Sequence, residues 1–120
     1  MNVQEHVQLE TYTTLQTPAM ARYLVEAASV ETVQSALALA KEQNLTIFVL
    51  GGGSNIILSK NFDGLVIVVR QKGIDILSEN DTTITLQVHA GESWHEFVTT
   101  TVQRGWYGLE NLALIPGTVG

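Results

Sequence analysis

The fold is decided by residues 46–55, which read Thr46-Ile47-Phe48-Val49-Leu50-Gly51-Gly52-Gly53-Ser54-Asn55. The first half is a continuous apolar run, which predicts a strand buried on both faces of a parallel sheet. The second half is rich in glycine, which allows positive φ and lets a ligand approach the backbone closely. Ser54 and Asn55 add short polar side chains beside a row of backbone amides. The stretch therefore predicts a strand followed by a loop able to hold a phosphate or pyrophosphate.

Upstream of this stretch, the sequence predicts a short strand over 22–26 and then an amphipathic helix. Ser29 is a suitable N-cap for that helix, and Asn44 suits its exit. Apolar residues recur behind Ser29 at spacings of three or four, as one helical face requires, at Val30, Val33, Leu37 and Ala40. Together with the strand over 46–50, these elements predict a β-α-β unit.

Downstream, two short strands are predicted over 55–58 and 65–69, separated by the turn-prone stretch 59–64. The pattern then changes. Residues 74–78 and 83–90 flank the turn-prone Glu79-Asn80-Asp81 and predict an antiparallel hairpin. We expect a second lobe to begin near residue 71.

A second helix is predicted to begin at Ser93, which forms a capping box with Glu96. Gly105 is well placed to end this helix, because glycine tolerates the left-handed conformation. Four apolar side chains are expected on its core face: Trp94, Phe97, Val98 and Val102.

Composition narrows the classes of function. The chain has 120 residues, of which 12 are acidic and 6 basic, so its net charge is −6. It lacks the basic excess that neutralises phosphates in a nucleic-acid-binding protein. Absence of cysteine removes disulfides and thiolate chemistry and fits a reducing compartment, so the cytoplasm is expected. No apolar run reaches the length of a membrane span, and Met1 to Glu10 is polar rather than a signal peptide.

The glycine loop over 51–55 is not a known nucleotide fingerprint. No Gly-Lys-Ser/Thr follows, so it is not a P-loop. The dinucleotide spacing G-x-G-x-x-G would need glycine where Ile56 stands. A tight turn between two strands remains the alternative to a ligand-binding loop. A second glycine-containing loop, Ile115 to Gly120, could present amides to a ring or phosphate, but taken alone this stretch favours an ordinary loop.

The remaining polar residues predict neither a metal site nor a complete active site. His6, His89 and His95 lack the spacing of metal ligands. Trp94, Trp106 and Tyr107 could stack on a ligand ring, but core packing is the simpler role for Trp94. The carboxylates of Glu92 and Glu110 have no evident partner, and Glu96 is explained by the capping box. No nucleophile–base pair is visible, so no catalytic residue is assigned.

Three motifs carry a family resemblance: Leu50 to Asn55, Gly91 to His95, and Gly108 to Gly120. In this order and spacing they resemble the N-terminal part of the UDP-N-acetylenolpyruvoylglucosamine reductases, flavoenzymes of bacterial peptidoglycan synthesis. The resemblance runs from about residue 9 to the last residue. It implies an α+β, two-lobed FAD-binding fold of the vanillyl-alcohol-oxidase type, with a β-α-β lobe over 1–70 and the start of a second lobe over 71–120.

The resemblance also implies cofactor-binding residues in both loops. The first loop corresponds to the family's loop around the FAD pyrophosphate, and the second to the start of another FAD-binding stretch. The residues implied are Gly51, Gly52, Gly53, Ser54, Asn55, Ile115, Pro116, Gly117, Thr118, Val119 and Gly120. One stretch departs from the family: Tyr12-Thr13-Thr14-Leu15 stands where Tyr-Asn-Thr-Phe is usual, which leaves open any cofactor contact made there.

The family's chemistry, as the resemblance implies it, passes hydride from NADPH to FAD and then to UDP-N-acetylglucosamine enolpyruvate. The serine acid, arginine and glutamate that support this step lie in parts of the family's sequence beyond these residues, so the chain alone is expected to be inactive. The implied partners include neither nucleic acid nor membrane, and the oligomeric state is left open. Two alternatives remain: a nucleotide- or phosphate-binding module without catalysis, and another flavin oxidoreductase of the same fold.

Overall fold

The computed structural model describes all residues from 1 to 120 and contains two sheets. The first has the strand order β1-β2-β4-β3, and the second is the pair β5-β6. The strands are β1 (Gln4–Gln8), β2 (Met20–Ala27), β3 (Thr46–Leu50), β4 (Phe62–Val69), β5 (Ile74–Glu79) and β6 (Ile84–Val88). The helices are α1 (Val30–Glu42) and α2 (Trp94–Gln103), with single 3-10 turns at Glu10–Tyr12 and Glu110–Leu112. The expected α+β class is confirmed.

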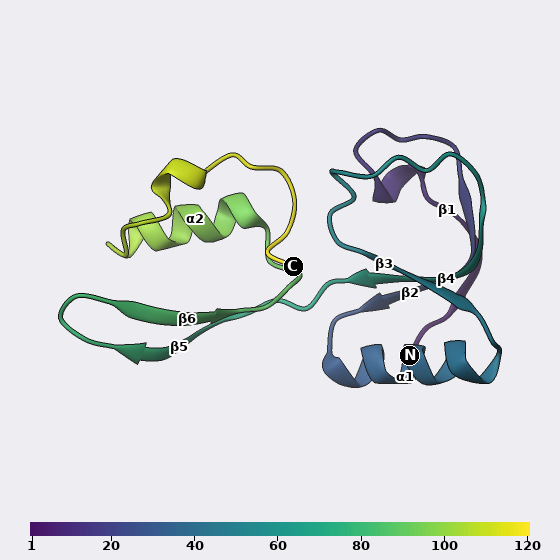
Figure 1. Cartoon of the computed structure of the whole chain (residues 1–120), viewed down its shortest axis with the longest axis horizontal. Coiled ribbons are helices and arrows are strands. Elements are labelled where there is room, and N and C mark those ends of the chain that lie inside the picture. The colour runs from purple at the N-terminus through teal and green to yellow at the C-terminus, as the bar shows by residue number, and fades with distance from the viewer.

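The elements form two groups along the long axis of the molecule (Figure 1). One group contains β1 to β4 and α1, the other contains β5, β6 and α2, and the C-terminus lies between them. The molecule measures 51 × 30 × 17 Å, and its radius of gyration is 16.7 Å. A compact domain of this length would have a radius of about 14 Å. The chain is therefore elongated, with a narrow junction where the C-terminal loop lies.

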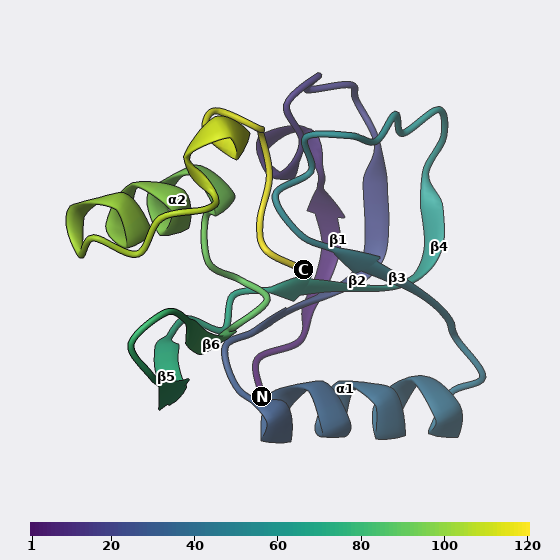
Figure 2. The same cartoon turned by 60° about the vertical axis from the view of Figure 1, so that its left-hand side comes forward.

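The first sheet has a hydrophobic core on each face. Strand β4 pairs in parallel with both β2 and β3, so it lies at the centre of the β-α-β unit. Its side chains alternate: Val66 and Val68 pack with Leu24 on one face, while Leu65 and Ile67 pack under α1 on the other. Helix α1 covers that second face (Figure 2). The predicted β-α-β unit is confirmed, with β4 inserted between its two strands.

The apolar run over 46–50 is not buried on both faces, as was expected. Strand β3 is an edge strand, and Val49 is 61% exposed. The strand buried on both faces is β4, whose start at Phe62 also takes up the end of the stretch expected to be a turn. The predicted strand over 55–58 is absent. Ile56 and Leu58 instead pack as loop residues against the core around Leu9 and Leu50.

Helix α1 begins as expected, since the Ser29 side chain accepts a hydrogen bond from the Thr32 amide at 3.2 Å. The predicted apolar face is only partly right. Val30 and Leu37 are exposed, whereas Val33, Ala36 and Ala40 pack against the sheet. Two of these three are alanines, which lets the helix lie close to the strands. Asn44 follows the helix in the left-handed conformation, with φ 53°.

The second group begins with the predicted hairpin, which is confirmed as the antiparallel pair β5 and β6. Helix α2 follows its expected bounds, and Gly105 lies just beyond it with φ 74°. Only half of the capping box forms: Ser93 Oγ accepts from the Glu96 amide at 3.4 Å, and no reciprocal bond is made. Phe97 and Val98 are buried as expected, but Val102 is exposed and Thr101 is buried instead.

One strand was not expected from the sequence. β1 lies within the polar stretch from Met1 to Glu10 and pairs antiparallel with β2. Three of its five residues are glutamine or glutamate, so it lacks the apolar alternation that marks a strand. Backbone pairing at the sheet edge, rather than side-chain burial, accounts for it.

Candidate functional site

The two glycine-containing loops meet at the junction between the groups of elements. The first follows β3, and the second is the C-terminal segment that returns to the junction (Figure 1). Together they line a cavity of about 230 Å³, with Leu50, Ile56 and Val49 at its apolar edge. From the first loop all of Gly51, Gly52, Gly53, Ser54 and Asn55 line it, and from the second Pro116, Gly117, Thr118 and Gly120. Ile115 and Val119 lie outside this lining.

The two loops approach each other too closely for side chains. A Cβ on Gly51 would lie 2.7 Å from Thr118 Oγ1, and one on Gly52 would lie 3.4 Å from Gly117 Cα. From the opposite side, a Cβ on Gly117 would lie 3.1 Å from Ser54 Oγ. A side chain at Gly51 would therefore force Thr118 to move, and Gly117 also has φ 118°, which favours glycine. At Gly52 a Cβ would only touch the second loop.

The backbone amides of the first loop are unused. None of the N–H groups of Gly51 to Asn55 donates a hydrogen bond within the chain. In the second loop the N–H groups of Gly117 and Thr118 are likewise unpaired. Successive unpaired amides that line a concavity are able to bind an anion, even on a protein that is acidic as a whole. The geometry fits a pyrophosphate held by backbone donors.

The second loop is held by a series of antiparallel contacts with the segment preceding α2. The Gly120 amide donates to Ala90 O at 3.1 Å, and the Val119 amide donates to Glu92 O at 2.9 Å. The Trp94 amide donates to Gly117 O at 3.1 Å. Val119 therefore has a structural role, since its amide holds the loop instead of facing the cavity.

The first turn of α2 also holds the residues that lead into this loop. Trp94 Nε1 donates to Leu112 O at 2.8 Å, and His95 Nδ1 accepts from the Leu114 amide at 3.1 Å. The Leu114 bond holds a non-glycine residue in the left-handed region, with φ 65°. Trp94 and His95 thus hold the segment that leads into the second loop.

The stretch that departs from the family pattern lies behind the glycine loop. The Thr14 amide donates to Gly53 O at 3.0 Å, and a Cβ on Gly53 would clash with Tyr12 O. Gly53 has φ 66°. Thr13 is buried, and its hydroxyl makes no hydrogen bond. This stretch therefore supports the loop from the side opposite the cavity.

Two charged groups flank Tyr12 at that supporting surface. The Arg70 guanidinium lies over the Tyr12 ring at 5.9 Å and pairs with Glu26 at 3.4 Å. Burial of the phenol, with the nearby Glu26 carboxylate, raises the pKa of Tyr12 above its usual value. Tyr12 is thus neutral at physiological pH. Its ring packs against the core, and its backbone lies against Gly53 of the first loop.

The other polar residues considered from sequence lie away from the cavity. His89 Nε2 lies 3.3 Å from Asp75, and His6 is on β1. The Glu110 carboxylate accepts from the Gly108 amide at 2.6 Å, and that bond lowers the pKa of Glu110. Glu92 has partners too: the Gly73 amide and Lys72. The absence of partners inferred for these two glutamates was wrong, because both bind backbone amides, which sequence spacing does not reveal.

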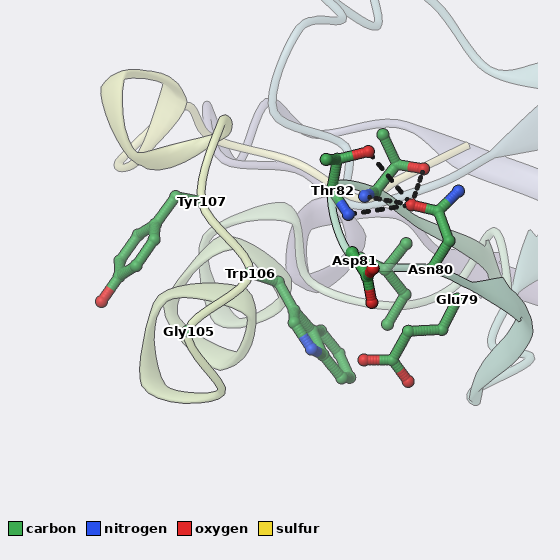
Figure 3. Close-up of a pocket in the computed structure, with 9 residues that line it drawn as sticks. Glu79, Asn80, Asp81, Thr82, Gly105, Trp106 and Tyr107 are labelled. Atoms are coloured by element: carbon green, nitrogen blue, oxygen red, sulfur yellow. Dashed lines mark hydrogen bonds between the residues drawn. The ribbon is translucent and has the colours of Figure 1, made fainter.

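A larger cavity of about 450 Å³ lies at the far end of the hairpin (Figure 3). Its walls are the turn Glu79–Thr83 and the segment Gly105–Tyr107, and it includes none of the expected site residues. Asn80 Oδ1 already accepts hydrogen bonds from the amides of Thr82 and Thr83, as the dashed lines show.

Neither helix of the structure has the length and apolar character that a membrane-spanning helix needs.

Comparison with known proteins agrees with this geometry. A family model described as "FAD binding domain" matches residues 21–120. UDP-N-acetylenolpyruvoylglucosamine reductase of Pseudomonas putida is 42% identical over 117 residues, covering 98% of this chain and 34% of that protein. The protein of the same name from a Psychrobacter species is 45% identical over 113 residues, covering 94% of this chain and 30% of its own length.

A solved structure of a protein with nearly the same name also matches this chain. The crystal structure of UDP-N-acetylenolpyruvylglucosamine reductase from Thermus caldophilus matches with a TM-score of 0.73 and 28% identity, over 100% of this chain and 40% of the other. The chain thus spans about a third of the length of the curated relatives that it matches.

Proposed function

Because this chain belongs to the family of FAD-binding domains, we propose that it is the N-terminal, FAD-binding part of a UDP-N-acetylenolpyruvoylglucosamine reductase. The resemblance read from the three motifs is confirmed by relatives that bear that name and match nearly the whole chain. The single observation that carries the binding role is the row of unpaired amides of Gly51 to Asn55 opposite the second loop.

Within this proposal, the first loop binds the FAD pyrophosphate through its backbone amides. Gly51 and Gly52 carry no side chain that would cover the amides, and Gly53 gives the loop its turn with φ 66°. The hydroxyl of Ser54 and the amide of Asn55 supply side-chain donors beside them. Gly117 and Thr118, whose amides are also unpaired, line the same cavity from the second loop. Pro116 and Gly120 line the same cavity, and the amides of Val119 and Gly120 hold the stretch in place. Ile115 completes the proposed binding stretch.

We assign the two groups of elements to two lobes of the binding domain, residues 1–70 and 71–120. The four-stranded sheet and the hairpin β5-β6 share no strand. Residues 70–73 link β4 of the sheet to β5 of the hairpin. The cofactor would lie at the junction, which is where both loops are found.

For the whole protein we propose NADPH-dependent reduction of UDP-N-acetylglucosamine enolpyruvate to UDP-N-acetylmuramate, in the cytoplasm. When bound, FAD supplies hydride transfer between NADPH and the enolpyruvyl double bond. The residues of this chain orient the cofactor and exclude water from its phosphates. The cavity between the loops is lined by no carboxylate, imidazole or amine, so no catalytic residue is assigned here. Nucleic acid and membrane are not among the proposed partners.

The proposal is tested by cofactor identity. We expect the purified protein to bind FAD, with quenching of flavin fluorescence on titration, and to release FAD on denaturation. NAD should not compete, because the loop lacks the dinucleotide spacing. Inorganic pyrophosphate should compete weakly, since it satisfies the amides but lacks the flavin and adenine contacts. Binding of NAD without flavin would refute the proposal, and binding of pyrophosphate alone would favour a phosphate-binding module.

A further inference from the structure

Glu92 lies between the hairpin and α2, next to the passage between the two lobes. Its side chain is only 18% exposed, which is unusual for a carboxylate unless it is paired. It belongs to the motif Gly91 to His95, to which the proposed function gives no role.

The side chain of Glu92 binds the linker between the lobes. One carboxylate oxygen accepts from the Gly73 amide at 2.8 Å, and the other lies 3.6 Å from Lys72 Nζ. The backbone on either side reinforces this contact: the Gly91 amide donates to Gln71 O at 2.9 Å, and the His89 amide donates to Gly73 O at 2.9 Å. Residues 71–73 are therefore held along their length by residues 89–92.

The main chain of the same residue binds the second loop. Glu92 O accepts from the Val119 amide at 2.9 Å, and the Gly120 amide donates to the adjacent Ala90 O. The second loop in turn lies against Gly51 and Gly52 of the first lobe. Glu92 thus connects the linker that joins the lobes with the loop that lies between them.

We propose that Glu92 is a positioning residue for the cofactor site: its carboxylate holds the linker so that the two loops keep a fixed separation. This inference rests on the proposed FAD-binding function. The Glu92 carboxylate is charged and largely removed from water, and it binds both the Gly73 amide and the Lys72 ammonium group. A hydrogen bond to a charged acceptor is stronger than one between neutral groups. Without it, the Gly73 amide loses its partner and the lobes lose an orienting contact.

The test measures lobe orientation and flavin binding separately. The chain has no cysteine, so Ser35→Cys on α1 and Ser78→Cys on β5 provide unique sites for spin labels on the two lobes. In the parent we expect one narrow distribution of distances between the labels. Glu92→Ala should broaden this distribution and weaken FAD binding about tenfold. Glu92→Gln, which keeps an oxygen for the Gly73 amide, should retain the narrow distribution and bind FAD within about threefold of the parent.

Two further variants make the outcome decisive. Glu96→Ala removes a carboxylate of α2 that makes no hydrogen bond or ion pair, and should change neither measurement. Glu92→Asp keeps the charge but is too short to reach Gly73, so it tests the contact even if Glu92→Ala fails to fold. A distribution that stays narrow in Glu92→Asp, with unchanged FAD affinity, would overturn the inference. If the parent binds no FAD, the proposed function fails, while the distance distributions still report whether Glu92 orients the lobes.

Discussion

At the scale of single residues, the three glycines after β3 have different roles. Gly53 lies in the left-handed region, and a Cβ there would meet the Tyr12 backbone, so this glycine is needed for folding of the loop. Gly52 has ordinary φ, and the nearest atom to its Cβ position is Gly117 Cα at 3.4 Å. Gly52 therefore faces the other loop and the cavity between them, whereas Gly53 faces the protein interior.

This difference leads to a prediction for substitutions with valine. Gly52→Val should weaken flavin binding more than it lowers the thermal midpoint, because its methyl groups enter the space between the loops. Gly53→Val should lower the midpoint even without flavin, since a β-branched residue is strained at positive φ. Both quantities can be measured on each variant by flavin fluorescence and thermal unfolding. Parent-like affinity in Gly52→Val would mean that the loop is only a turn.

At the scale of elements, helix α1 is held by a narrow apolar face and by its N-cap. Only Val33, Ala36 and Ala40 contact the sheet, and two of these have small side chains. The hydrogen bond from the Thr32 amide to Ser29 Oγ satisfies one of the free donors at the helix start. The Glu31 carboxylate, which is in the first turn, has a lowered pKa because it accepts hydrogen bonds from its own amide and from the Ser29 side chain.

Ser29→Ala should accordingly lower the free energy of unfolding by about 1 kcal/mol, the usual cost of losing a serine N-cap. Ser35→Ala is a matched control, because Ser35 is an exposed position in the same helix and alanine is the better helix former. Urea unfolding followed by circular dichroism measures both. Equal loss of stability in the two variants would contradict the capping role.

The elements also show how far sequence patterns carry. The helices were predictable because capping residues and glycine or asparagine exits are local signals. Strand β1 was not, because its polar residues give no alternation and its pairing with β2 depends on distant residues. The burial of β3 was misjudged for a related reason: an apolar run does not reveal whether a strand is central or at an edge, and here β4 enters between β2 and β3.

At the scale of the whole molecule, the elongated shape places the two glycine-containing loops at a narrow junction. We expect the isolated 120-residue chain to show no NADPH-dependent reduction of UDP-N-acetylglucosamine enolpyruvate, even with excess FAD. Hydride delivery to one alkene carbon requires protonation of its neighbour, and absence of a general acid costs on the order of 10² to 10⁴ in rate. No titratable side chain lines the cavity between the loops.

The assay is NADPH oxidation with product identified by mass, and the full-length reductase of Pseudomonas putida serves as positive control. Turnover within about tenfold of that control, a difference of about 1.4 kcal/mol in barrier, would mean that the catalytic groups lie among these residues. A binding measurement on the same preparation separates loss of chemistry from loss of cofactor.

Local sequence was sufficient to identify the helices, the hairpin, the glycine loops and the family, because these depend on residue types at short, regular spacing. It did not reveal that Gly117 and Thr118 would lie against Gly51 and Gly52, or that Glu92 would bind the linker at Gly73. Those contacts join residues 19 or more positions apart, and each involves the backbone of a glycine, which gives no sequence signal for its partner. Their partners are selected by how the two groups of elements pack, so they become visible only in three dimensions.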